Sequence, residues 1–305
     1  MKDSIRRNKE SIKKILSPIG KSLGILGLLF VFYKLSQEYT LDSFLQRVSG
    51  TVSILPSLLL LNLLSVLVGI YVWHLMLRNY AAKPFPYLLS YYYFAKTEIS
   101  KYLPGNIFHF VGRQLLASSL EISQIEMAKI SLLFSIFLMI GTTLSSTLFA
   151  LFSGELPHSI LFLMITSSLA AIAVILLLYP SFKKEQKISL VLLSTLSVAL
   201  QGVLLGMIVA SQLDHMEISL FLETAGIYIV SWLIGFITPG ASGGLGVREG
   251  TFIMIASFLH IEISSEIVVF SVLLLRLVNI GVDITLFLST FLLSPSRKSQ
   301  KNTLN

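Results

Sequence analysis

Apolar runs recur along the whole chain and are separated by short polar stretches. A helix needs about 20 apolar residues to cross the hydrocarbon core of a bilayer. The runs that meet or approach this length are residues 19–36, 52–78, 127–152, 159–179, 188–211 and 265–293. Strands of a membrane barrel would instead alternate over about ten residues. The pattern therefore predicts an all-α polytopic membrane protein.

Two further stretches, 84–125 and 212–264, do not read as simple spans because each carries charges and a Pro-Gly pair. Proline lacks a backbone donor and glycine permits unusual dihedral angles, so each pair predicts a helix end at membrane depth. Basic residues favour the cytoplasmic side of a membrane. With the lysine cluster at 183–187 placed there, the first stretch enters and leaves from the cytoplasm, and the second does so from outside. We predict six transmembrane helices plus two opposed re-entrant hairpins.

The hairpins share a spacing that indicates an internal repeat. Pro104 precedes Arg113 as Pro239 precedes Arg248, and both pairs are offset by 135 residues. The same shift places the first-half spans largely on second-half spans. Because three full spans separate the halves, about 19–152 and 158–293, we predict an inverted repeat, as in many secondary transporters.

Charge supports a membrane protein rather than a nucleic-acid-binding protein. Residues 1–21 hold seven Lys or Arg against two Asp or Glu, and the tail adds Arg297, Lys298 and Lys301. The net charge of +7 therefore belongs to tails that flank the membrane, which predicts cytoplasmic termini. We divide the chain into a basic amphipathic segment (1–18), a single transmembrane domain (19–293) and a basic tail (294–305).

Composition narrows the chemistry. Hydrophobic residues make up 54% and charged residues 13% of the 305 residues, which leaves too little polar surface for a soluble globule. The absence of cysteine excludes disulfides and thiolate catalysis. The five histidines form no metal-binding pair and no catalytic triad. We predict no catalytic residue, no metal and no cofactor.

The breaks in the hairpins are the candidate binding residues. Backbone groups freed near a helix break must face protein or water rather than lipid. The helix expected to start near Val247 would point its positive N-terminal end at the preceding loop, a geometry that binds anions. Glycines that serve only close helix packing are the alternative. The break residues are Pro104, Gly105, Asn106, Pro239, Gly240, Gly243 and Gly244.

Arg113 and Arg248 are the candidate ligands for phosphate, because a guanidinium is costly in a membrane and binds phosphate with two parallel hydrogen bonds. The alternative is internal pairing with an acid. The acids considered are Glu98, Glu223 and Glu249.

Arg276 and Asp283 lie seven residues apart on one face of the last span. Both are candidate substrate-binding residues, as are the acids Glu98, Glu223 and Glu249. For Arg276 and Asp283 we favour a structural role, as a neutralising pair or as a counterion for Glu223.

The segments Tyr102-Leu-Pro-Gly-Asn106 and Pro239-Gly-Ala-Ser-Gly-Gly-Leu-Gly-Val-Arg-Glu249 resemble the lysylphosphatidylglycerol synthase transmembrane family, a flippase-like domain that also occurs as stand-alone proteins. The resemblance covers nearly the whole chain. It implies lipid translocation in a prokaryotic inner membrane. No soluble synthase domain follows the last span, so the resemblance does not imply aminoacyl-lipid synthesis here.

These observations lead to a flippase or transporter for a phosphate-bearing phospholipid, glycolipid or polyprenyl lipid. The ligand expected is a membrane lipid with an anionic headgroup. Two other classes stay open at this point: a membrane-embedded lipid transferase, and a non-catalytic partner subunit of a glycosyltransferase or lipid synthase. The sequence also leaves open whether the chain forms a homo-oligomer.

Overall fold

The computed structural model describes residues 41–81, 86–102, 108–116, 120, 122–178, 182–238, 244 and 246–293, and within them every regular element is a helix. In chain order they are α2 (Leu41–Thr51), η1 (Val52–Ile54), α3 (Leu55–Tyr80), α4 (Tyr87–Glu98), η2 (Ile99–Tyr102), α5 (Phe108–Leu116), α6 (Gln124–Ser153), α7 (His158–Leu178), α8 (Lys184–Ala210), α9 (Ile218–Ile237), α10 (Val247–Phe258) and α11 (Ser265–Leu292).

Five helical segments in this part of the chain are long and apolar enough to cross a membrane. They are Leu45–Tyr80, Gln124–Ser153, Lys184–Ala210, Ile218–Ile237 and Ser265–Leu292. Four of them contain the predicted spans 52–78, 127–152, 188–211 and 265–293 almost entirely, which confirms the all-helical membrane class. The predicted span 19–36 lies outside the described residues.

One segment differs from the predicted pattern. The sequence predicts a re-entrant arm before Pro239, but α9 has 20 residues and is itself apolar enough to cross a membrane. Its single acid, Glu223, is too little to offset the apolar residues around it. The predicted span 159–179 corresponds to α7, a helix of 21 residues, His158–Leu178, that covers nearly the same range.

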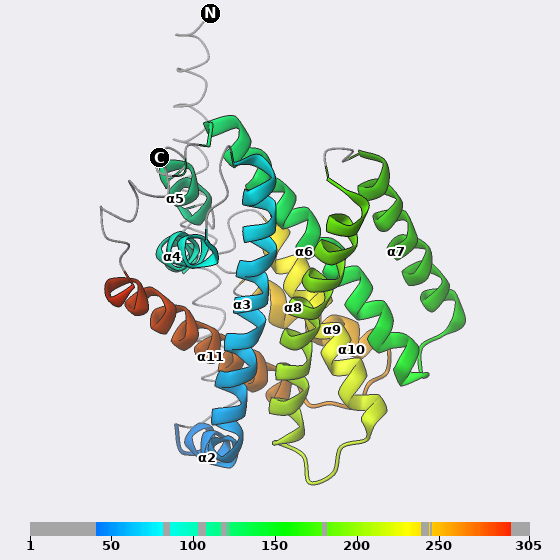
Figure 1. Ribbon diagram of the computed structural model, residues 1–305. Coiled ribbons are helices and arrows are strands. Elements are labelled where there is room, and N and C mark those ends of the chain that lie inside the picture. Colours follow the sequence, from blue (N-terminus) through cyan, green and yellow to red (C-terminus); the bar gives the residue numbers. More distant parts are fainter. Residues whose placement is uncertain are drawn as a thin grey trace, which may run out of the picture.

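The helices form a bundle with α3, α6, α8 and α9 packed side by side, as Figure 1 shows. α7 stands at the outer edge against α6, and the short helices α4 and α5 lie together beside α3. α11 crosses the bundle and contacts α3, α4, α8 and α10. Buried apolar side chains form two main clusters. One consists mainly of residues from α8, α9, α10 and α11, and the other is centred on α3, α4 and α6.

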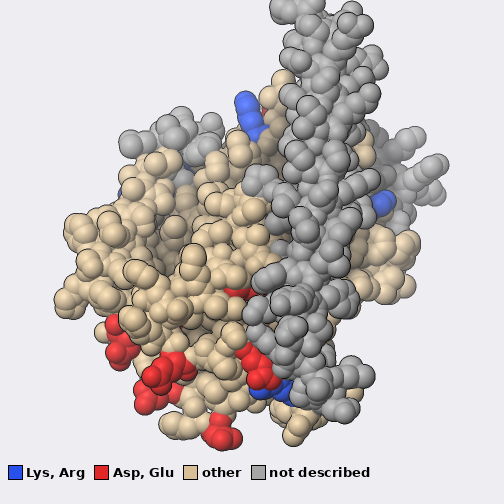
Figure 2. All heavy atoms as spheres, turned by 180° about the vertical axis from the view of Figure 1, so that it is seen from behind, with Lys and Arg blue, Asp and Glu red and all other residues tan. Residues whose placement is uncertain are grey.

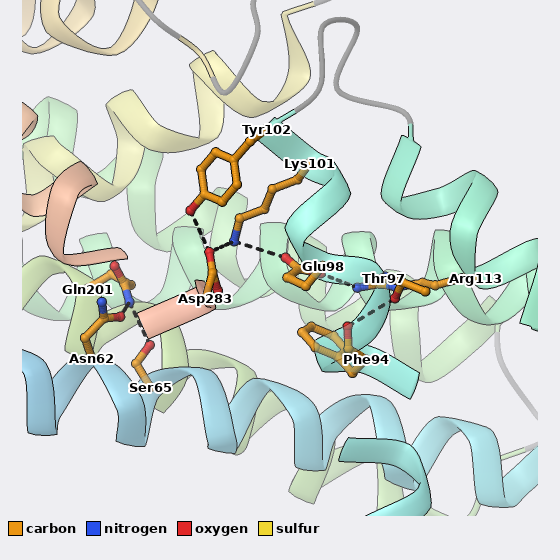
Figure 3. A network of polar contacts seen from close by, with 10 residues as sticks. All are labelled: Asn62, Ser65, Phe94, Thr97, Glu98, Lys101, Tyr102, Arg113, Gln201 and Asp283. Carbon is orange, nitrogen blue, oxygen red and sulfur yellow. Dashed lines mark hydrogen bonds and ion pairs between the residues drawn. The ribbon is translucent and has the colours of Figure 1, made fainter. Parts of the chain in front are cut away.

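Small polar residues join α3 and α8 where they cross. The Ser65 hydroxyl donates to the Ser197 carbonyl at 2.8 Å, and the Ser197 hydroxyl donates to the Ser65 carbonyl at 2.9 Å. Gln201 donates to Asn62 at 2.9 Å and to Ser65 at 3.0 Å (Figure 3). Such interhelical hydrogen bonds satisfy polar groups that lipid cannot. They hold α3 and α8 together at the centre of the bundle, next to Asp283 of α11.

Candidate functional site

Arg113 of α5 is enclosed by aromatic rings. The side chain is 2% exposed, and its guanidinium carbon lies 4.6 Å from the centre of the Phe94 ring and 5.2 Å from that of Phe134. Trp73 and Phe110 complete the enclosure at 5.6 and 5.9 Å. Cation–π attraction is strongest where water is excluded, as it is here. Arg113 is thereby shielded from a ligand.

Glu98 neutralises Arg113 and starts a chain of ion pairs. The Arg113 Nη2 donates to Glu98 Oε2 at 2.9 Å, and the other carboxylate oxygen of Glu98 lies 3.2 Å from Lys101 Nζ. Lys101 continues to Asp283 Oδ2 of α11 at 2.7 Å, and the Tyr102 hydroxyl donates to the same oxygen at 2.6 Å (Figure 3). Asp283 itself is buried. The chain of four charges ties α4, η2 and α5 to α11 and sums to zero.

A second charged cluster lies between α9, α10 and α11. Arg248 and Glu249 stand in the first turn of α10, and Arg276 of α11 reaches Glu249 with Nη2 3.2 Å from Oε1. Tyr228 of α9, Glu249, Arg276 and also Tyr102 are near enough to Arg248 to act on its charge. By the α10 pocket we mean this group of four side chains, Tyr228, Arg248, Glu249 and Arg276.

The backbone around Arg248 has the form that the glycine-rich sequence predicts. α10 begins at Val247, directly after Gly246, whose φ is +77°, and Gly244 has a φ of +71°. A Cβ atom on Gly244 would lie 2.9 Å from the Arg248 Nε, and one on Gly235 of α9 would lie 2.7 Å from its Cγ. Gly235 and Gly244 also contact each other, so the side chain of Arg248 packs across both glycines, and a larger residue at either position would displace it. Its guanidinium lies 5.9 Å from the Trp232 ring.

Polar atoms of the α10 pocket are buried without hydrogen bonds in the described structure. Glu249 is 2% exposed, and its ion pair with Arg276 does not have the angles of a hydrogen bond. The atoms concerned are Tyr228 Oη, Arg248 Nε, both Glu249 carboxylate oxygens, Arg276 Nε and Arg276 Nη2. A buried polar group without a partner costs roughly 1–3 kcal/mol. So many in one place indicate a site made for a polar ligand or water.

The other predicted site residues fall elsewhere. Pro104, Gly105, Asn106, Pro239, Gly240 and Gly243 lie outside the described residues. Glu223 is partly buried in α9 with Glu155 as its charged neighbour, and it makes no ion pair with an arginine in the described structure. Arg276 and Asp283 pair with Glu249 and Lys101 and not with each other, so the predicted neutralising pair and the counterion for Glu223 are both wrong.

Sequence reasoning did not identify several residues of these clusters. Tyr102 entered only as the first residue of the Tyr102-Leu-Pro-Gly-Asn106 motif, and nothing in the sequence beside Lys101 shows that it pairs with an acid of the last span. Tyr228 and the rings around Arg113 sit in apolar runs and carry no local signal, because their role depends on which helices pack together. No group of His, Cys, Asp and Glu among the described residues could hold a metal ion.

A scan against protein-family models and a search of curated proteins found no match to this chain.

Proposed function

We propose that the protein moves a lipid with a phosphate-bearing headgroup between the leaflets of a prokaryotic inner membrane, with the α10 pocket as the headgroup site. One observation carries this proposal: Arg248 makes no ion pair among the described residues, although it lies in a bundle whose long helices are apolar enough to cross a membrane. Because a guanidinium without a carboxylate partner is costly in such surroundings, Arg248 should bind an anionic ligand.

The charge balance of the two clusters points the same way. The ion-pair chain holds two cations and two anions, and the α10 pocket holds Arg248 and Arg276 against Glu249. One positive charge is therefore left over, in the pocket. The N-terminal end of α10 adds partial positive charge at the same place. A phosphodiester, with one negative charge, would neutralise it.

Residues 239–249 resemble the lysylphosphatidylglycerol synthase transmembrane family. This resemblance is in keeping with the site, because the motif supplies two residues of the pocket, Arg248 and Glu249, and also Gly244, which packs against Arg248. The resemblance implies a flippase-like activity. We extend that implication to this chain as part of the proposal.

The proposal includes two inverted halves. A shift of 135 residues relates α3 to α8, α4 to α9, α5 to α10 and α6 to α11. The contacts agree with this relation: α3 packs against α8, α4 packs on α11 as α9 packs on α6, and α5 pairs with α4 as α10 pairs with α9. Two broken-helix regions brought together in this way would frame a central site.

The halves differ where it matters for binding. Arg113 and Arg248 hold matched positions, but the position matched to Glu98 is Leu233. The first arginine is therefore neutralised within its own hairpin and the second is not. We assign Arg113 to the scaffold and Arg248 to the headgroup.

A second difference enlarges the positive charge of the second half. The residue matched to Arg276 is Gly141. A Cβ atom there would lie 2.7 Å from the Ser194 carbonyl oxygen, so this position in the first half serves close packing of α6 on α8. The repeat thus carries one binding arginine pair and not two.

Reconstitution in liposomes tests the transport function. Acyl-matched fluorescent lipids with anionic, zwitterionic and phosphate-free sugar headgroups are placed in the outer leaflet, and their movement inward is followed by chemical quenching. We expect the purified protein to speed the movement of the anionic phospholipid well above that in protein-free liposomes. If every phosphate-bearing lipid moves only at the protein-free rate, the transport proposal is wrong.

The proposed orientation places both termini and the 183–187 lysines in the cytoplasm. Figure 2 shows acidic side chains gathered at one end of the described surface. The connections at that end carry Glu155, Asp214, Glu217 and Glu262. Arg78 in the last turn of α3 and Lys183 and Lys184 at the start of α8 lie at the opposite helix ends. Positive residues are retained in the cytoplasm.

Because the chain has no cysteine, single-cysteine labelling in intact cells reads this orientation directly. Lys184→Cys should resist a membrane-impermeant maleimide until the cells are opened, and Asp214→Cys should react at once. The reverse pattern would contradict the orientation and with it the inverted arrangement of the halves.

A further inference from the structure

The α10 pocket contains a carboxylate as well as arginines, and this restricts the headgroup further. Glu249 lies 3.2 Å from Arg276, is 2% exposed, and has two oxygens that accept no hydrogen bond in the described structure. The pocket therefore offers acceptors beside its phosphate-binding donors. A bare phosphate, which has few protons to donate, would leave those acceptors unused.

We propose, resting on the transport function above, that the pocket selects a headgroup with one negative charge and neighbouring hydroxyl donors: a polyol or sugar phosphodiester. The phosphate would accept from Arg248 and Arg276. A hydroxyl next to it would donate to Glu249, and the Tyr228 hydroxyl, fully buried and without a partner, would bond to a second one. Each of the four side chains of the pocket then gains a partner in the headgroup.

An ammonium group fits this pocket poorly. The one carboxylate in it is already opposed by Arg276, and Arg248 and the N-terminal end of α10 add positive charge around it. A zwitterionic headgroup would bring its cation close to two guanidinium groups in a site with little water. Like charges in a medium of low dielectric repel strongly.

A dianionic phosphomonoester fits less well for the opposite reason. Arg248 and Arg276 against Glu249 leave one positive charge, which a phosphodiester cancels. A phosphomonoester carries about −1.5 to −2 at neutral pH and would leave an excess negative charge beside the Glu249 carboxylate. The net charge of the pocket therefore matches a headgroup with a single negative charge.

Soluble headgroup analogues test this selection without any transport step. Binding of glycerophosphoglycerol, glycerophosphoethanolamine, glycerol 3-phosphate and inorganic phosphate to the detergent-purified protein is measured by titration calorimetry. We expect glycerophosphoglycerol to bind roughly tenfold or more tightly than each of the other three, the ratio of one good hydrogen bond or charge match. Equal affinity for glycerophosphoglycerol and glycerophosphoethanolamine would overturn the inference, as would tighter binding of inorganic phosphate.

Glu249→Gln provides the matched variant. It keeps the shape of the side chain but removes the negative charge, so the pocket should now favour glycerol 3-phosphate over glycerophosphoglycerol. Glu262→Gln, a change of the same kind at an exposed position, should keep the wild-type order. If folded Glu249→Gln protein binds the analogues in the same order of affinity as the wild type, the proposal is contradicted. If that variant does not fold, the affinities of the four analogues for the wild-type protein decide alone.

The two proposals can fail separately. Selective binding of glycerophosphoglycerol without movement of any lipid between leaflets would leave the selection intact and remove the transport function. Movement of anionic and zwitterionic phospholipids at the same rate, with no order among the soluble analogues, would leave transport and remove the selection.

Discussion

Replacing Arg248 by lysine should slow the movement of an anionic lipid between leaflets roughly ten- to hundredfold while thermal unfolding stays near that of the wild type. Lysine keeps the charge but loses the planar fork that binds two phosphate oxygens at once, a loss of roughly 1.5–3 kcal/mol. Folding should tolerate the change because Arg248 makes no ion pair in the described structure, and its contacts with Gly235, Gly244 and the Trp232 ring involve the stem as well as the charged group. Leaflet movement in proteoliposomes and the midpoint of thermal unfolding are the two measurements.

Arg78→Lys is the matched control, because Arg78 is exposed at the end of α3 and is a member of neither charged cluster. It should change neither quantity. Well-folded Arg248→Lys protein that transports at the wild-type rate would show that the guanidinium is not a phosphate ligand.

Glu98→Gln should destabilise the protein by about 3 kcal/mol, the usual cost of leaving a buried charge unpaired. Arg113 is 2% exposed, and Glu98 is its ion-pair partner in the described structure. The aromatic rings that enclose Arg113 exclude the water that could replace the lost carboxylate. Denaturant unfolding of the detergent-purified protein measures the loss, with exposed Glu185→Gln as the control.

Removing both charges distinguishes a buried pair from a change in shape. Glu98→Gln combined with Arg113→Met should recover most of the lost stability, because a buried ion pair and an apolar pair of similar volume are often equally stable. A double variant as unstable as Glu98→Gln alone would mean that Glu98 acts through contacts other than Arg113.

Hydropathy predicted most of the helices because, in lipid, an apolar run of sufficient length has no other stable conformation. The start of α10 at Val247 was also predictable, since Gly244 and Gly246 allow the positive φ angles that end the preceding turn. These features depend on neighbours in the sequence alone.

The re-entrant arm before Pro239 was harder to judge. A Pro-Gly pair marks where a helix ends but not how deep it begins, and the apolar stretch that became α9 was long enough for either arrangement. Hydropathy does not separate a re-entrant arm from a tilted span.

The charge partners could not be predicted because they join distant parts of the chain. Tyr102 and Asp283 are 181 residues apart, and their contact depends on α11 crossing beside α4. The sequence identified Arg113 and Arg248 as equivalent, and their matched spacing supports that. The structure separates them through Glu98, which pairs with Arg113 and whose counterpart 135 residues later is Leu233.

The ratio of two rates measured in the same proteoliposomes tests the central claim most directly. Acyl-matched lipids, one with an anionic polyol phosphodiester headgroup and one zwitterionic, are labelled with different fluorophores and followed together in wild-type and Arg248→Gln protein. If the α10 pocket binds the headgroup during transport, the anionic lipid moves faster in the wild type by roughly tenfold, and the ratio falls to about one without the Arg248 charge. The same ratio in both proteins would contradict the assignment of the headgroup site to Arg248.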